Sequence, residues 1–325
     1  MSEVTYREAI NAALAAELES DADVVMIGED VAAAGGVFKV TEGLQQRFGA
    51  DRVRDTPISE QAIIGTALGA AVTGMRPVAE VMFADFAGVC FDGIANQLPK
   101  YRYMTGGQVS VPVTLRLVNG ASTGFGAQHS QAVENWFLGI SGLKICAPAS
   151  PADAYGLLRS AIRDDNPVLF FEHKALYLRK GPLDPDVEVP LGAADVVRPG
   201  ADVTIVATQL MRERALEAAE KLSAEGIEAE VIDPRTLVPF DFETVLRSIE
   251  KTGNLVVVEE GPGSGGWGST LVARMAAEAF ELFDSPPRLL GTDDTPTPFA
   301  AELEEAWLPD VGEIAGAARG MAVTA

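Results

Sequence analysis

Glu60 is the residue of this sequence whose setting best suits acid–base chemistry. It stands just before the glycine- and alanine-rich run of residues 62–75, which is typical of a buried helix. Pro57 favours extended backbone at the residue before it, and Ser59 is a good N-cap, so the helix is predicted to begin at Glu60. The helix N-terminus stabilises a carboxylate there, whereas burial disfavours its charge. Glu60 could therefore share a proton, or it could only complement the helix dipole.

The chain has two histidines, and their surroundings differ. His129 follows the glycine-rich segment of residues 119–126, where packing gives little reason for an imidazole. It could donate or accept a proton near neutral pH, although a structural histidine is the alternative. His173 ends an apolar strand between charged neighbours, and we expect a structural or peripheral role.

Polar and aromatic residues also follow predicted strands of the N-terminal half. Glu29 and Asp30 come after one apolar strand, where open α/β sheets place ligand groups, or they cap the next segment. Met82 and Phe86 follow another strand and could line a pocket for a flat ligand or belong to the core. A glycine motif at residues 263–268 fits a dinucleotide fingerprint, but its position favours a plain strand-to-helix turn.

Strands that alternate with helices surround these residues, which predicts an α/β protein with parallel sheets covered on both faces by helices. Gly and Pro residues cluster near 181–195, so we expect domains at 1–180 and 196–325 joined by a linker. The predicted helices are 6–20, 40–48, 60–75, 86–103, 152–163, 212–226 and 242–252. The predicted strands are 24–27, 77–82, 113–117, 167–171, 203–207, 230–233 and 254–259.

Composition excludes several classes of protein. The 325 residues carry a formal net charge of −22, with 16 acidic and 10 basic side chains in 1–150 but 31 and 15 in 151–325. This argues against nucleic acid or anionic membranes as partners, and means either solubility alone or a face for a basic partner. No stretch is long enough to cross a bilayer and no leader is evident, so we expect a cytoplasmic protein. Cys90 and Cys146 are expected to be reduced core thiols.

Taken together, a series of short motifs resembles the beta subunit of the thiamine-diphosphate-dependent dehydrogenase component of 2-oxo acid dehydrogenase complexes, within the transketolase-like superfamily. The resemblance runs in order from Tyr6 to about Trp307. Its motifs are residues 26–31, 55–60, 74–77, 102–107, 127–131 and 162–167. It implies a transketolase-like pyrimidine-binding domain followed by a transketolase C-terminal domain.

The resemblance gives each candidate residue a role. It implies that Glu60 hydrogen-bonds the aminopyrimidine ring of thiamine diphosphate and thereby helps to remove the thiazolium C2 proton. It implies that His129 assists proton transfer when the acyl group passes to a lipoyl group. Cofactor contacts are expected from Glu29, Ile58, Glu60, Met82 and Phe86, and substrate contacts from Phe83, Ala84, Phe125 and Gly126.

One expected motif is missing, and its absence implies a partner. The family holds magnesium diphosphate with a Gly-Asp-Gly motif, which this chain lacks. An alpha subunit is therefore expected to supply the diphosphate and Mg²⁺ half, in an alpha-two, beta-two tetramer. Gly65 and Gly69, one helical turn apart, could serve close packing at that interface or within the chain.

Further positions match other binding sites of the family. Asp294 aligns with a position that relatives use to contact the lipoyl acyltransferase core. A structural potassium ion is held in some relatives at the positions of Val113, Ala161, Ile162, Asp164 and Asn166.

The expected reaction is oxidative decarboxylation of pyruvate or a branched-chain 2-oxo acid. The alternatives are the beta subunit of an acetoin dehydrogenase and a noncatalytic assembly protein of the same fold.

Overall fold

The computed structural model describes residues 2–322, which form two compact α/β units. The first unit comprises Met1–Asn119 and Trp136–Leu191, and the second comprises Gly120–Asn135 and Gly192–Ala325. The segment Gly120–Asn135, which carries His129, thus groups with the second unit although it lies within the sequence of the first. No helix of the described residues is long and apolar enough to span a membrane.

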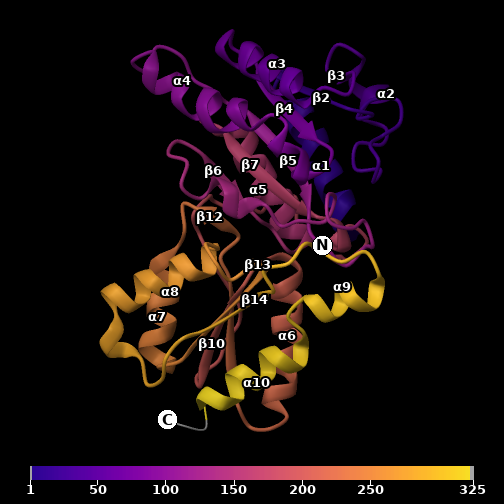
Figure 1. Cartoon of the computed structure of the whole chain (residues 1–325). Coiled ribbons are helices and arrows are strands. Elements are labelled where there is room, and N and C mark those ends of the chain that lie inside the picture. The colour runs from indigo at the N-terminus through magenta and orange to yellow at the C-terminus, as the bar shows by residue number, and fades with distance from the viewer. Residues whose placement is uncertain (1, 323–325) are drawn as a thin grey trace. The chain divides into compact units, whose positions relative to one another are not determined.

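The first unit is built on a parallel sheet in the order β6-β7-β5-β4-β2-β3, and β1 pairs with β8 in a separate antiparallel pair. In Figure 1, α3 and α4 lie on one side of the sheet, and α1 and α5 on the other. Its strands are β1 (Ser2–Thr5), β2 (Val24–Gly28), β3 (Val53–Asp55), β4 (Arg76–Val81), β5 (Thr114–Asn119), β6 (Lys144–Cys146), β7 (Val168–His173) and β8 (Lys180–Leu183). Its helices are α1 (Tyr6–Ser20), α2 (Leu44–Phe48), α3 (Glu60–Val72), α4 (Leu98–Met104) and α5 (Pro151–Arg163).

The second unit has the sheet order β14-β13-β10-β11-β9, parallel except for β9 at one edge. Helices α6 and α10 pack on each other and on this sheet, over a core of Val, Ile, Leu and Ala side chains. Its strands are β9 (Asp195–Arg198), β10 (Val203–Ala207), β11 (Ala229–Asp233), β12 (Thr236–Val238), β13 (Leu255–Pro262) and β14 (Arg288–Thr292). Its helices are α6 (Gln209–Ser223), α7 (Phe242–Thr252), α8 (Trp267–Glu278), α9 (Ala301–Trp307) and α10 (Val311–Ala322).

Local signals explain why several elements begin where they do. Thr5 and Glu8 form the reciprocal capping box expected at the start of α1. Ser150 caps α5, and Asp241 caps α7, each through a side-chain hydrogen bond. Strands β2 and β10 are buried along their whole length, as expected for parallel sheets covered on both faces.

Two predicted helices are wrong in part. The helix expected over 40–48 is confined to α2, because Gly43 takes a positive φ of 81° just before it. The helix expected over 86–103 is three pieces: η1 (Ala84–Gly88), a π-helical turn η2 (Gly93–Gln97), and α4. Pro99 cannot donate a hydrogen bond to Ala95, whose carbonyl oxygen accepts one from the Lys100 ammonium instead. The long helix is therefore interrupted before α4.

Candidate functional site

The sheet of the first unit changes its direction of winding between β2 and β4. Strand β3 pairs with one edge of β2, and the chain then returns to place β4 on the other edge. In open parallel sheets, ligands bind outside the carboxyl ends of the strands at such a switch point. The residues that follow these three strands include Glu29, Glu60 and Met82. The topology thus brings the predicted cofactor residues to the same end of the sheet.

Glu60 and Glu29 lie close together at this end. The Thr56 N–H donates to the Gly28 carbonyl oxygen at 2.9 Å, which ties the segment before α3 to the end of β2. Glu60 is the first residue of α3 and is buried. Ser59 precedes α3 but makes no side-chain capping bond, contrary to expectation. Its backbone N–H instead faces the Glu29 carboxyl group and partly offsets the rise in that group's pKa.

The surroundings of this pair disfavour charge on Glu29. Burial, and then the neighbouring charges of Glu60 and Asp30, raise the pKa of the Glu29 carboxyl. Within residues 2–322, neither Glu29 nor Glu60 forms an ion pair with a basic side chain. A second carboxylate next to Glu29, with no cation beside either within residues 2–322, disfavours charge on Glu29. Glu29 therefore keeps a proton to a higher pH than an ordinary glutamate does.

Apolar side chains follow the same strands as the two carboxylates. Ile58, two residues before α3, has 84% of its surface exposed. Met82 and Phe86 are half-buried, and the Phe86 ring packs edge-on against Phe83 with 5.8 Å between ring centroids. Phe83 and Ala84, predicted on the substrate side, are buried in this unit. A buried carboxylate beside partly uncovered apolar groups fits a flat heteroaromatic ring with a basic nitrogen.

His129 lies in the second unit, on the segment Gly120–Asn135. It is half-buried, and its backbone N–H donates to the Gly126 carbonyl oxygen at 3.2 Å. Phe125 is exposed, whereas Gly126 is buried with the Phe299 ring next to it. His173 is buried in the first unit, where its Nδ1 accepts a hydrogen bond from the Ala175 N–H, in keeping with a structural role.

A buried ionic cluster in the first unit was not predicted. The fully buried Arg116 guanidinium donates to Glu172 at 2.6 and 2.8 Å, and also donates to Glu80. The Tyr177 hydroxyl donates to Glu172 at 2.8 Å. Burial, which outweighs the nearby Arg116 charge, raises the pKa of Glu80. Charged residues inside the otherwise apolar stretches 78–81 and 113–118 were the signal that could have revealed this cluster.

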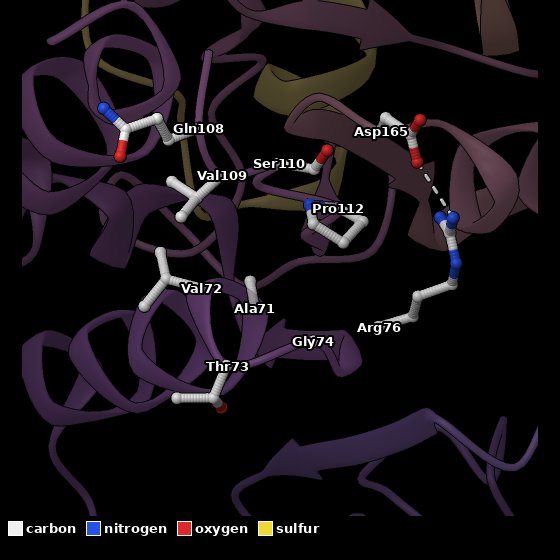
Figure 2. A pocket seen from close by; sticks show the side chains of 10 residues that line it. All are labelled: Ala71, Val72, Thr73, Gly74, Arg76, Gln108, Val109, Ser110, Pro112 and Asp165. Atoms are coloured by element: carbon white, nitrogen blue, oxygen red, sulfur yellow. Dashed lines mark hydrogen bonds and ion pairs between the residues drawn. The ribbon is translucent and has the colours of Figure 1, made fainter. Parts of the chain in front are cut away.

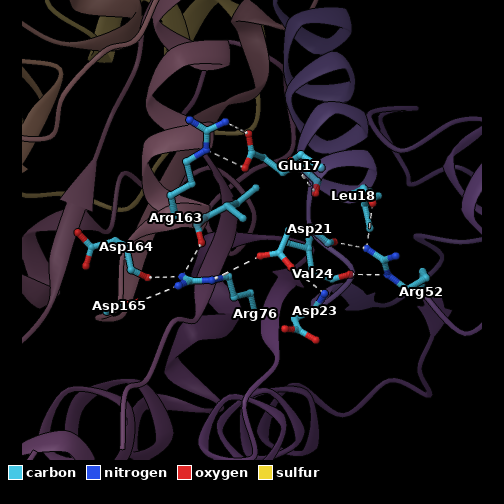
Figure 3. Close-up of polar contacts among 12 residues, drawn as sticks. Glu17, Leu18, Asp21, Asp23, Val24, Arg52, Arg76, Arg163, Asp164 and Asp165 are labelled. Atoms are coloured by element: carbon cyan, nitrogen blue, oxygen red, sulfur yellow. Dashed lines mark hydrogen bonds and ion pairs between the residues drawn. The ribbon is translucent and has the colours of Figure 1, made fainter.

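The positions matched to a potassium site lie around the end of α5, where a guanidinium is already present. Arg76 donates to the backbone oxygens of Ile162 and Asp164 at 3.3 and 3.2 Å, and to the Asp165 carboxylate at 2.8 Å. Figure 3 shows Arg76 between these groups and Asp21. The carbonyl oxygens of Val113 and Ala161 accept backbone hydrogen bonds, and the Asn166 side-chain oxygen accepts one from Arg102. The oxygen atoms that would bind potassium thus already accept hydrogen bonds from Arg76, Arg102 and backbone N–H groups. A potassium ion at these positions stays a prediction.

A pocket of about 460 Å³ lies near the same guanidinium, between the C-terminal end of α3 and the segment before β5. Figure 2 shows Gln108 and Ser110 among the side chains that line it, together with the Arg76–Asp165 pair. Arg76 begins β4, so this pocket lies at the end of that strand opposite Met82. It is therefore separate from the Glu29–Glu60 pair.

The glycine motif of the second unit has a packing explanation. It forms the turn between β13 and α8, as predicted. A Cβ on Gly266 would lie 2.2 Å from the Glu259 carboxylate, so this glycine leaves room for a buried acid. Burial raises the pKa of Glu259 to about 7, against hydrogen bonds from Gly268, Asn135 and Trp267. Asp294 is exposed nearby in this unit and accepts a hydrogen bond from the Ser264 hydroxyl at 3.1 Å.

The metal-binding side chains and the two thiols of the described residues do not form a further candidate site. Within residues 2–322, no group of three or more His, Cys, Asp and Glu side chains could hold a metal ion. Cys90 and Cys146 are free and buried, as predicted. Burial raises the pKa of the Cys90 thiol to about 12, which makes it a poor nucleophile.

Family comparisons agree with this geometry. Residues 2–180 match the model "Transketolase, pyrimidine binding domain", and residues 192–314 match "Transketolase, C-terminal domain". A solved structure described as "Split gene transketolase, inactive beta4 tetramer" superposes with a TM-score of 0.82 at 26% identity, covering 99% of both chains.

Curated relatives match along nearly the whole chain. The beta subunit of acetoin:2,6-dichlorophenolindophenol oxidoreductase from Cupriavidus necator is 46% identical over 97% of this chain and 96% of its own length. The mitochondrial pyruvate dehydrogenase E1 component subunit beta of Dictyostelium discoideum is 45% identical, over 98% of this chain and 90% of its own. The corresponding Rhizobium meliloti subunit is 43% identical, over 99% of this chain and 70% of its own.

Proposed function

The chain belongs to the transketolase-like family of dehydrogenase beta subunits, and we propose that it forms half of a thiamine-diphosphate-dependent active site. Its reaction is the oxidative decarboxylation of pyruvate or a branched-chain 2-oxo acid, with acyl transfer to a lipoyl group. The observation that carries this proposal is the buried Glu60 at the start of α3, beside Glu29, at the switch point of the sheet.

The residues of the site suit the pyrimidine end of that cofactor. When bound, thiamine diphosphate supplies an electron sink for the carboxyl-group loss. Glu60 would hold the aminopyrimidine ring through a hydrogen bond to a ring nitrogen. Ile58, Met82 and Phe86 cover the ring faces with apolar surface. Glu29, whose pKa burial raises, keeps a proton available next to Glu60.

The other half of the site is assigned to an alpha subunit, which also holds Mg²⁺ and the diphosphate. A Cβ at Gly65 or Gly69 would meet nothing within 4 Å, so packing inside this chain does not account for either glycine. Tyr103 and Met104, at the end of α4 in the same unit, are also largely exposed. Such a face on a helix that begins with a catalytic residue suits a closely packed partner helix, in an alpha-two, beta-two tetramer.

The second unit is assigned to acyl transfer and assembly. His129 assists proton transfer when the acyl group passes to the lipoyl group. Asp294 is exposed, and the acidic C-terminal half offers charge complementarity to a basic domain of the acyltransferase core.

The test is to co-express the chain with a candidate alpha subunit, purify the tetramer, and assay thiamine-diphosphate-dependent turnover with an artificial electron acceptor. Pyruvate, branched-chain 2-oxo acids and acetoin are compared in parallel. Acetoin remains the second candidate because relatives named for acetoin and for pyruvate are almost equally similar. An assembled tetramer that binds the cofactor but turns over none of the three would contradict the enzymatic proposal and favour a noncatalytic assembly protein.

A further inference from the structure

The segment that carries His129 is fastened to the rest of the second unit at both ends and near its middle. The Ala121 N–H donates to the Glu260 carboxylate on β13. The Gly124 N–H donates to Glu304 Oε2 on α9 at 3.0 Å. Asn135 Oδ1 accepts a hydrogen bond from the Trp267 N–H at 3.0 Å. The middle attachment is the one nearest to His129 in sequence.

Glu304 is unusual among the charged residues of α9. Only 3% of its surface is exposed, whereas Glu302 and Glu305 on the same helix are exposed. Its Oε1 atom is buried without a hydrogen-bond partner within residues 2–322, so its side-chain hydrogen bonding is directed to the Gly124 N–H. Burying a carboxylate in this way costs free energy that a leucine would not, so α9 retains an acid here at a cost to stability.

A tight turn connects Gly124, which Glu304 holds, to His129. Gly124 and Gly126 both have positive φ, 71° and 75°, and a Cβ on Gly126 would lie 3.4 Å from the Phe299 ring. The Gly126 carbonyl oxygen accepts the His129 N–H at 3.2 Å. Phe299 lies just before α9, and Glu304 lies on α9. One short stretch of chain therefore adjoins both Gly126 and Gly124.

We propose that Glu304 is a positioning residue for His129. Its carboxylate fixes the Gly124 backbone and, through the turn of residues 124–129, the place of the imidazole. The role in catalysis rests on the proposed function, but the positioning itself does not. Glu304 touches neither cofactor nor substrate in this account, and acts only through the loop.

The first test measures the loop without any turnover. In amide hydrogen exchange on the full chain, Glu304→Ala should speed exchange of peptides covering residues 121–129 about tenfold, because the Gly124 N–H loses its acceptor. Glu304→Gln keeps an acceptor oxygen and should stay within about twofold of wild type. Reaction of His129 with diethyl pyrocarbonate, followed by mass spectrometry, should change rate in the alanine variant and not in the glutamine variant.

Glu302→Ala is the matched control, because it removes an exposed glutamate from the same helix. Its exchange and His129 modification should equal those of wild type. If Glu304→Ala leaves both readouts unchanged, or alters exchange throughout the unit rather than at residues 121–129, the positioning role is contradicted.

The second test uses the assembled enzyme and two readouts. In Glu304→Ala, lipoyl-coupled turnover should fall at least about tenfold more than turnover with an artificial acceptor, because His129 is assigned only to acyl transfer. In a His129→Ala background the same substitution should change lipoyl-coupled turnover by less than about twofold, since two residues that act through one step are not additive. A full additional loss in that background would overturn the proposal. Inactive wild-type enzyme would contradict the proposed function but leave the exchange test decisive for Glu304.

Discussion

Two sets of buried carboxylates in this protein differ in one respect, the presence of a cation. Glu80 and Glu172 face the buried guanidinium of Arg116, which donates hydrogen bonds to both. Glu29 and Glu60, at the carboxyl ends of the same sheet, have no basic partner within the described residues. Hydrogen bonds from Arg116 fix Glu80 and Glu172 in place, even though burial raises the pKa of Glu80, whereas no guanidinium fixes Glu29 or Glu60 within the described residues. The difference separates structural acids from candidate catalytic ones within a single sheet.

Glu259 in the second unit extends the comparison. It is fully buried and forms no ion pair within the part of the chain that the structure describes, and its pKa is raised to about 7. The Gly268 N–H, in the first turn of α8, donates a hydrogen bond to it at 3.4 Å. It is therefore an unpaired acid that the fold uses for packing a loop, so the absence of a cation must be joined to an accessible position before chemistry is inferred.

The largest effect on stability is expected from removing the Arg116 guanidinium. Arg116→Met should lower the free energy of unfolding by about 3–5 kcal/mol, because it leaves two buried carboxylates without their partner. Urea unfolding followed by circular dichroism measures this. Arg319→Met, which removes the exposed partner of Glu225, is the control and should change stability little. An equally small effect at both positions would remove the distinction between paired and unpaired acids.

A smaller effect is expected from Glu259, whose titration makes the free energy of unfolding depend on pH. The carboxyl titrates near 4.5 when unfolded and near 7 when folded, so the folded state binds its proton more tightly. Its contribution to stability is complete below pH 4.5 and is lost as pH rises through 7, by about 3 kcal/mol at pH 8. Glu259→Gln should flatten this part of the stability profile. The exposed Glu243→Gln should not, and equal profiles for all three proteins would count against the assignment.

Features of the fold and the site could be predicted where they depend on residues that are neighbours in sequence. Glu60 at a helix start, the capping box of α1 and the strand-to-helix turn before α8 follow from neighbours in sequence, and all were predicted. The approach of Glu29, after β2, to Glu60, at the start of α3, is a contact between distant elements, and no local pattern specified it. The sequence therefore indicated which acids could act but not how they meet.

Other features depended on tertiary contacts that a linear pattern does not contain. The Arg116 cluster joins β4, β5 and β7, and its members look like isolated charges in apolar strands. Likewise, the grouping of Gly120–Asn135 with the second unit follows from hydrogen bonds to Glu260 and Glu304, far along the chain. The π-helical turn of residues 93–97 adjoins Ile64 on α3, again a contact between distant residues.

The smallest effect on stability is expected at Gly69, on the exposed face of α3. Gly69→Ala should raise the free energy of unfolding of the isolated chain by about 0.5–1 kcal/mol, since a methyl group there meets nothing and alanine favours helix. Gly93→Ala is the matched opposite, because its Cβ would lie 2.7 Å from Ile64 Cγ2. The first variant should also weaken binding to the alpha subunit, measured by analytical ultracentrifugation. Unweakened assembly would mean that this face is not the interface.

The central claim is that the unpaired carboxylate of Glu60 serves the pyrimidine ring of thiamine diphosphate. The most direct measurement is the rate at which the C2 proton of the bound cofactor exchanges with deuterium, followed by quench-flow NMR in the tetramer with its alpha subunit. Glu60→Gln should bind the cofactor and assemble, yet slow this exchange at least about 100-fold. Exchange at the wild-type rate in that variant would contradict the account.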